Sequence, residues 1–173
     1  MGCMVERGNK LQWLAAYGGQ TADQLLSLEG EYRIDSLVVA FEQALCQKEA
    51  RVEKGALSPE EQVVLAVEAL EREVNNGGYA QFFQNSSREY ASVIVDSLRH
   101  IGCVNTAVLT ERAIKAVGSS KLESDAIKTA MAMDSEARDK TLSECDKEYF
   151  RCAEPIAERL FAFIKANRIR VAL

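Results

Sequence analysis

The chain has 173 residues, a mass of 19.1 kDa, 47% apolar residues, 27% charged residues and a formal net charge of −5. These values are typical of a globular protein with one hydrophobic core, and they exclude a disordered or collagen-like chain. The negative charge argues against direct binding to nucleic acid, and no apolar run approaches the ~20 residues that cross a membrane.

The N-terminal residues and the cysteines predict the compartment. Glu6 and Arg7 lie where a signal peptide would have its apolar run. The cysteines number five, none forms a C-x-x-C pair, and His100 is the single histidine. We therefore expect a cytoplasmic protein with reduced thiols and with no metal or cofactor.

Apolar residues recur at helical spacing in nearly every segment. Ser58-Pro59-Glu60-Glu61 combines an N-cap, a first-turn proline and a capping glutamate, and Ser86–Glu89 and Ser120–Glu123 repeat the S-x-x-E pattern. Gly77-Gly78, Gly102 and Gly118 each follow an apolar run, as helix ends do. In chain order, helices are predicted over residues 10–17, 20–28, 31–50, 59–75, 78–84, 88–101, 104–117, 122–132, 138–150 and 154–168.

The sequence predicts an all-α fold with a single compact multi-helix domain over residues 1–173. The only β-branched cluster, Val93-Ile94-Val95, fits helical spacing, and no linker or internal repeat divides the chain. Within the domain we expect N-terminal helices in residues 1–57, a core in 58–158 and a basic helix end in 159–173. Val52–Leu57 is the expected hinge.

Acidic residues gather on one face of the helix expected over residues 31–50. At 100° per residue they occupy a stripe about 40° wide and about 27 Å long, and the nearby bases point elsewhere. A stripe of one sign forfeits stabilising i,i+4 ion pairs, and its separations of ~6 and ~10 Å are of the order of phosphate spacing on DNA. The first row is Glu31, Asp35, Glu42, Glu49 and Glu53, and the next helix adds Glu60, Glu61, Glu68 and Glu71.

The C-terminal end is basic. It holds Arg159, Lys165, Arg168 and Arg170 and no acid, so residues 1–158 carry 17 bases against 26 acids. These cations either complement the dipole of a final helix or form a patch for an acidic partner.

Features of common enzymes are missing from the sequence. A nucleophilic Cys or Ser requires an activating histidine, and His100 is expected to be an ordinary surface or packed residue near a helix end. The chain contains no glycine-rich phosphate loop. We therefore expect a protein that is not an enzyme.

Residues 73–87 are unusually rich in amides and aromatic rings. They could form a pocket in which Asn75, Asn76, Gln81 and Asn85 converge on a ligand. They could instead form a helix end, a glycine turn and a short buried helix. In that second interpretation the structural motif consists of Asn75, Asn76, Gly77, Gly78, Phe82 and Phe83.

The segment Glu73-Val74-Asn75-Asn76-Gly77-Gly78, continued to Ser87 and followed by a helix ending in Ile101-Gly102, resembles the hallmark of a widespread bacterial all-helical family. The resemblance extends from about Tyr32 to Arg159. The best-known member of this family is a nineteen-kilodalton DNA mimic that binds a helix-turn-helix repressor, and the mass of this chain agrees with it. The resemblance implies an acidic protein that covers the DNA-reading surface of such a repressor and relieves repression.

Three functional hypotheses follow. The first is a DNA mimic whose two acidic rows bind a basic DNA-binding protein, expected to be a helix-turn-helix transcriptional repressor. The second is a small-ligand-binding or enzymatic domain that uses the amide-rich turn Asn75–Asn85. The third is a non-catalytic scaffold whose acidic face is only solvated. A closed homodimer is the default oligomer.

Overall fold

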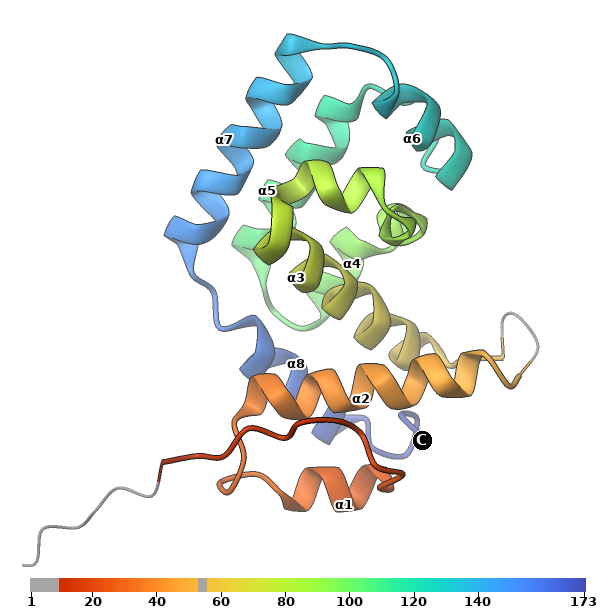
Figure 1. The fold of residues 1–173 in the computed structure, drawn as a ribbon, viewed down its shortest axis with the longest axis vertical. Helices are drawn as coiled ribbons and strands as arrows, with labels where there is room; N and C mark the ends of the chain where they lie inside the picture. Colours follow the sequence, from red (N-terminus) through yellow and green to blue (C-terminus); the bar gives the residue numbers. More distant parts are fainter. Residues whose placement is uncertain (1–9, 53–55) are drawn as a thin grey trace, which may run out of the picture.

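Capping interactions fix the helix ends in this computed structural model, which describes residues 10–52 and 56–173 (Figure 1). Ser58 Oγ accepts from the Glu61 amide while the Glu61 carboxylate accepts from the Ser58 amide, as its S-x-x-E pattern predicts. Gly118 ends its helix in the left-handed region at φ 71°. The helices are α1 (Ala22–Ser27), α2 (Ile34–Glu49), α3 (Pro59–Gln84), the 3-10 helix η1 (Ser86–Ser92), α4 (Ile94–His100), α5 (Val104–Val117), α6 (Ser124–Met131), α7 (Glu136–Cys152) and α8 (Ile156–Ala166).

The all-α prediction is confirmed, and most helices lie where the sequence predicts them. Helix α5 has the predicted bounds, and the predicted break at Gly77-Gly78 is a kink inside α3, where both glycines leave helical φ/ψ. The predicted 88–101 helix is divided into η1 and α4. The S-x-x-E patterns at Ser86 and Ser120 do not form N-caps. Asn85 precedes η1 and Glu123 precedes α6, and neither side chain makes a capping hydrogen bond. The expected hinge overlaps residues 53–55, which lie outside the described residues.

The helix predicted over residues 10–17 is wrong. Residues 10–17 form no helix, and Gln12 forms a parallel bridge with Tyr32 through hydrogen bonds to Glu31 O at 2.9 Å and from Arg33 N at 2.8 Å. The amide of Tyr17 donates to the Gln43 side chain at 2.8 Å. These long-range partners replace the local hydrogen bonds that a helix would make.

Helix α3 runs through the middle of the molecule (Figure 1). Its first part contacts α2 and α8, and its later part contacts η1, α4, α6 and α7. Residues 64–70 are buried in succession, so this stretch of α3 is surrounded on all sides rather than on one face. The helix thereby joins a lower layer of α1, α2 and α8 to an upper group formed by the other helices.

The C-terminal residues return to the start of α3. The Ala172 amide donates to Glu61 Oε1 at 3.0 Å, and the Arg170 carbonyl accepts from Ser58 Oγ at 2.8 Å. Val171 is fully buried beside them. The last residues are therefore part of the core packing. None of the helices in the described residues is long and apolar enough to span a membrane.

Candidate acidic interface

Helix α2 carries the first acidic row on one face. Asp35, Glu42 and Glu49 all lie within the helix, so the 100° step keeps them within about 40° of one another, over about 21 Å. Glu31 is exposed but precedes the helix, in the turn that bridges to Gln12. Glu53 lies outside the described residues. The structure therefore groups three carboxylates of this row on a continuous helical face, with Glu31 beyond its N-terminal end.

Two carboxylates of this row form ion pairs within the chain. Asp35 Oδ2 lies 2.5 Å from Arg33 Nη2, and Glu42 pairs with Arg72 from α3. Arg33 also lies over the ring of Trp13 at 5.5 Å. Asp35 keeps 40% of its side-chain surface exposed and Glu42 only 12%. The face is therefore less negative than the stripe of acids alone would suggest.

The second row is not a surface row. Glu61 is 1% exposed, caps α3 and pairs with Lys48 at 2.7 Å. Glu68 is 5% exposed, and Glu60 pairs with Arg170 at 3.3 Å. The sequence predicted that Glu60, Glu61, Glu68 and Glu71 would all face a partner. This is wrong for Glu61 and Glu68, because α2 and the C-terminal residues pack against the face of α3 on which they lie.

The acids of α2 and α3 interact electrostatically. Burial, followed by the charges of Glu42 and Glu71, raises the pKa of Glu68 to about 8, and Arg72 only partly offsets this. Burial, followed by the charge of Glu158 on α8, raises the pKa of Glu71 to about 7. A depression between α2 and α3 is lined by Asp35, Glu42, Glu68, Glu71 and Arg72 among others. This part of the molecule therefore gathers carboxylates and opposes the ionisation of Glu68 and Glu71.

The C-terminal cations pair with acids of the N-terminal layer. Lys165 pairs with Glu29, and Arg168 Nη1 lies 3.3 Å from Asp23 Oδ1. Arg159 donates to the Gly102 carbonyl and lies 3.7 Å from Glu154. The basic end thus pairs with acids of the same chain. The sequence instead predicts that these cations either complement a helix dipole or bind an acidic partner.

The amide-rich segment is organised around Glu73, which the sequence interpretation did not single out. The Glu73 carboxylate accepts from the side chains of Gln81, Asn85 and Ser87, each at 2.8 Å. Burial raises its pKa, but these hydrogen bonds outweigh burial and leave the pKa below its ordinary value. Gln81 and Asn85 therefore converge on a carboxylate of the chain itself, whereas Asn75 and Asn76 are exposed.

The two glycines and two phenylalanines of this segment also have structural positions. Gly78 has φ +78°, and a Cβ there would lie 2.4 Å from the Asp146 carboxylate, which accepts from the Tyr79 amide at 2.8 Å. Phe82 and Phe83 are fully buried. The signal for Glu73 was present in the sequence as three hydrogen-bond donors 8, 12 and 14 residues later. Asp146 gave no such signal, because it comes from α7.

A comparison with protein families finds a match over the later helices. A family model described as DMP19-like protein matches residues 55–167, which is well over half of the chain. The matched residues begin near the start of α3 and end just after α8, and they include the amide-rich segment. No curated protein and no solved structure matches the chain.

Proposed function

Because this chain belongs to the DMP19-like protein family, a family of non-enzymatic DNA mimics, we propose that it binds a helix-turn-helix transcriptional repressor and relieves its repression. The family membership is the observation that carries this proposal, and it implies a DNA-binding protein as the partner. The repressor would be bound on the surface that otherwise contacts DNA, in the bacterial cytoplasm. A phosphate-reading surface is rich in Lys and Arg, which an acidic protein face can attract over a distance.

The acids of α2 are the proposed contact residues. Asp35, Glu42 and Glu49 share one helical face, and Glu31 extends the row beyond its N-terminal end. Glu60, which pairs with Arg170, and Glu71 stay proposed contacts from the sequence alone, whereas the burial of Glu61 and Glu68 removes them from the proposed contacts. Glu53 stays a candidate from the sequence alone. Each exposed contact would contribute little, so the interface depends on the row as a whole.

A charge-reversal experiment tests this proposal. The repressor is captured from lysate of the source bacterium, purified, and bound to its labelled operator, from which the wild-type chain should release it. The variant with Glu31→Lys, Asp35→Lys and Glu49→Lys should fail to release it at about 0.1 M salt, where surface charges are weakly screened. The wild-type effect should weaken steeply toward about 0.5 M salt.

A matched variant controls for net charge. The control changes the net charge by the same amount at three exposed positions outside α2. It carries Glu89→Lys in η1, Asp134→Lys just before α7 and Glu144→Lys in α7. This control should still release the repressor. If the α2 variant keeps its helicity and competes as well as the control, the α2 row is not the interface. A light-scattering mass of the free chain tests the expected homodimer separately.

A further inference from the structure

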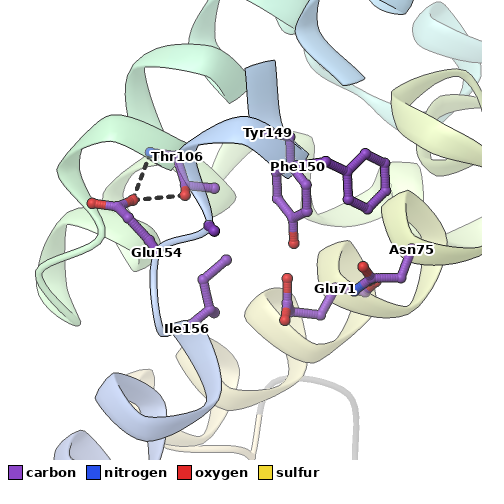
Figure 2. A pocket seen from close by; sticks show the side chains of 8 residues that line it. Glu71, Asn75, Thr106, Tyr149, Phe150, Glu154 and Ile156 are labelled. Carbon is purple, nitrogen blue, oxygen red and sulfur yellow. Dashed lines mark hydrogen bonds between the residues drawn. The ribbon is translucent and has the colours of Figure 1, made fainter. Parts of the chain in front are cut away.

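Glu71 borders a pocket between α3 and the C-terminal helices. The pocket lies between α3 and the connection from α7 to α8, and it has a volume of about 180 Å³ (Figure 2). Its walls include Glu71 and Asn75 from α3, Tyr149 and Phe150 from α7, and Glu154 from the connection. A volume several times the ~30 Å³ share of one water molecule leaves room for a small organic group.

Two buried oxygens in this pocket lack hydrogen bonds. Tyr149 Oη and Glu71 Oε1 make none with any residue in the described parts of the chain. Tyr149 is 8% exposed, and its hydroxyl points toward the Glu71 carboxylate across the pocket (Figure 2). Buried polar atoms are normally paired, so these two oxygens indicate a ligand with hydrogen-bond donors.

The surroundings favour a positive charge. Acids from three other elements line the depressions around Glu71: Glu154 from the connection, Glu158 from α8 and Asp35 from α2. Glu68 adds a further acid from α3, and Arg33 and Arg72 line only the two neighbouring depressions. An anion would be repelled by this set of carboxylates.

The aromatic rings favour an organic cation over a metal ion. Phe150 is 56% exposed at the pocket, and its ring packs edge-to-face on Tyr149 with centroids 5.4 Å apart. An aromatic face attracts a guanidinium group. Within residues 10–52 and 56–173, no group of three or more His, Cys, Asp or Glu side chains is arranged to hold a metal ion.

We propose that this pocket binds the guanidinium group of a small organic cation or of a peptide side chain. The guanidinium N–H groups donate to the Glu71 carboxylate and to Tyr149 Oη, and its plane lies against Phe150. Glu154 also lines the pocket, but the amide and hydroxyl of Thr106 hold it at 2.8 and 2.7 Å, and Arg159 lies 3.7 Å from it and partly neutralises its charge. The site lies between α3 and the connection from α7 to α8, and its binding does not depend on the repressor.

The ionisation of Glu71 gives the site a pH dependence. Burial and Glu158 raise the pKa of Glu71 to about 7, so part of the population is protonated in neutral solution. A cation binds the ionised form better and displaces the proton. Its affinity should therefore rise between pH 6 and pH 8.

The test is a titration of the full chain with ethylguanidinium at pH 8, followed by NMR shifts and by calorimetry. We expect saturable binding with a Kd on the order of 1 mM. Glu71→Gln should weaken it at least about tenfold because a charge-assisted hydrogen bond is lost, and Tyr149→Phe should weaken it by about threefold. Glu144→Gln, an exposed carboxylate on α7, should leave it unchanged.

Two further ligands separate charge from shape. Urea has a similar plane of N–H donors without the charge, and tetramethylammonium has the charge without donors, so neither should bind measurably. The proposal fails if ethylguanidinium does not saturate at pH 8, if folded Glu71→Gln binds it equally, or if urea binds as well. The titration contains no repressor, so its failure leaves the proposed function standing, and failure of the repressor assay leaves this site standing.

Discussion

Glu68 shows how far the environment of one residue differs from its appearance in the sequence. The residue looks like a member of a solvated acidic row, but it is 5% exposed, with Glu42 and Glu71 close enough to oppose its ionisation. Its pKa of about 8 means that the folded protein keeps the proton when the unfolded chain has already released it.

This difference makes stability fall as pH rises. Between the ordinary glutamate pKa and about 8, the folded state binds more protons than the unfolded state, so the free energy of unfolding decreases with pH over that window. Glu68→Gln should flatten the decrease and raise the free energy of unfolding at pH 8 by on the order of 2 kcal/mol. Urea unfolding from pH 5 to 8.5 measures it, with Glu144→Gln as the exposed control. Parallel pH curves for Glu68→Gln and wild type would contradict the burial argument.

The glycines with positive φ offer a matched comparison at the residue scale. A Cβ on Gly78 would meet the Asp146 carboxylate at 2.4 Å, whereas the nearest atom to a Cβ on Gly118 is 4.0 Å away. Gly118→Ala should cost about 1 kcal/mol for its φ of +71° alone. Gly78→Ala should cost about 3 kcal/mol because Asp146 must also move. Denaturant unfolding measures both, and equal losses would show that the close approach of α7 is unimportant.

At the scale of elements, the kinked end of α3 is held by one buried carboxylate. Glu73 accepts three side-chain hydrogen bonds, from Gln81 beyond the kink, from Asn85 at the end of α3 and from Ser87 in η1. Glu73→Ala should cost about 3 kcal/mol because three donors lose their acceptor. Glu144→Ala should change stability by less than about 0.5 kcal/mol. Thermal unfolding followed by circular dichroism compares them, and similar melting temperatures would rule out the structural role of Glu73.

Helix limits were predictable where the signals are local. Pro59 and Glu61 lie within one turn of Ser58, and the predicted start of α3 there is confirmed. The predicted end of α5 at Gly118 is also confirmed. Residues 10–17 have a helix-like apolar pattern, but their hydrogen bonds go to Glu31, Arg33 and Gln43, which lie elsewhere in the chain. A pattern of local spacing contains no information about such partners.

The acidic face was predictable only in part for a similar reason. Helical period correctly places Asp35, Glu42 and Glu49 on one face of α2. Which acids remain exposed is decided by neighbouring elements: the C-terminal residues cover Glu61, and Arg72 reaches Glu42 from α3. Asn75 was named from the sequence as a possible pocket residue and does line the proposed guanidinium pocket. The pairing of Glu71 with Tyr149 was not predictable, because 77 residues separate them in the sequence.

At the scale of the whole molecule, the C-terminal residues close the lower layer. Val171 is fully buried, and Lys48 Nζ donates to the Ala172 carbonyl at 2.7 Å. Val171→Ala should lower the free energy of unfolding by about 2 kcal/mol, while Ile169→Ala, at a residue 87% exposed, should leave it nearly unchanged. Chemical unfolding of the two variants checks this, and equal stabilities would mean that the C-terminal residues do not belong to the core.

The stretch of α3 that is buried on every side, residues 64–70, has a consequence for how the protein opens. Its backbone amides are inside both the lower layer and the upper group, so no local fraying can bring them to water. They should exchange hydrogen for deuterium only when the entire domain unfolds. Since Glu68 lies in this stretch, the slowest exchange in the molecule would also record its protonation.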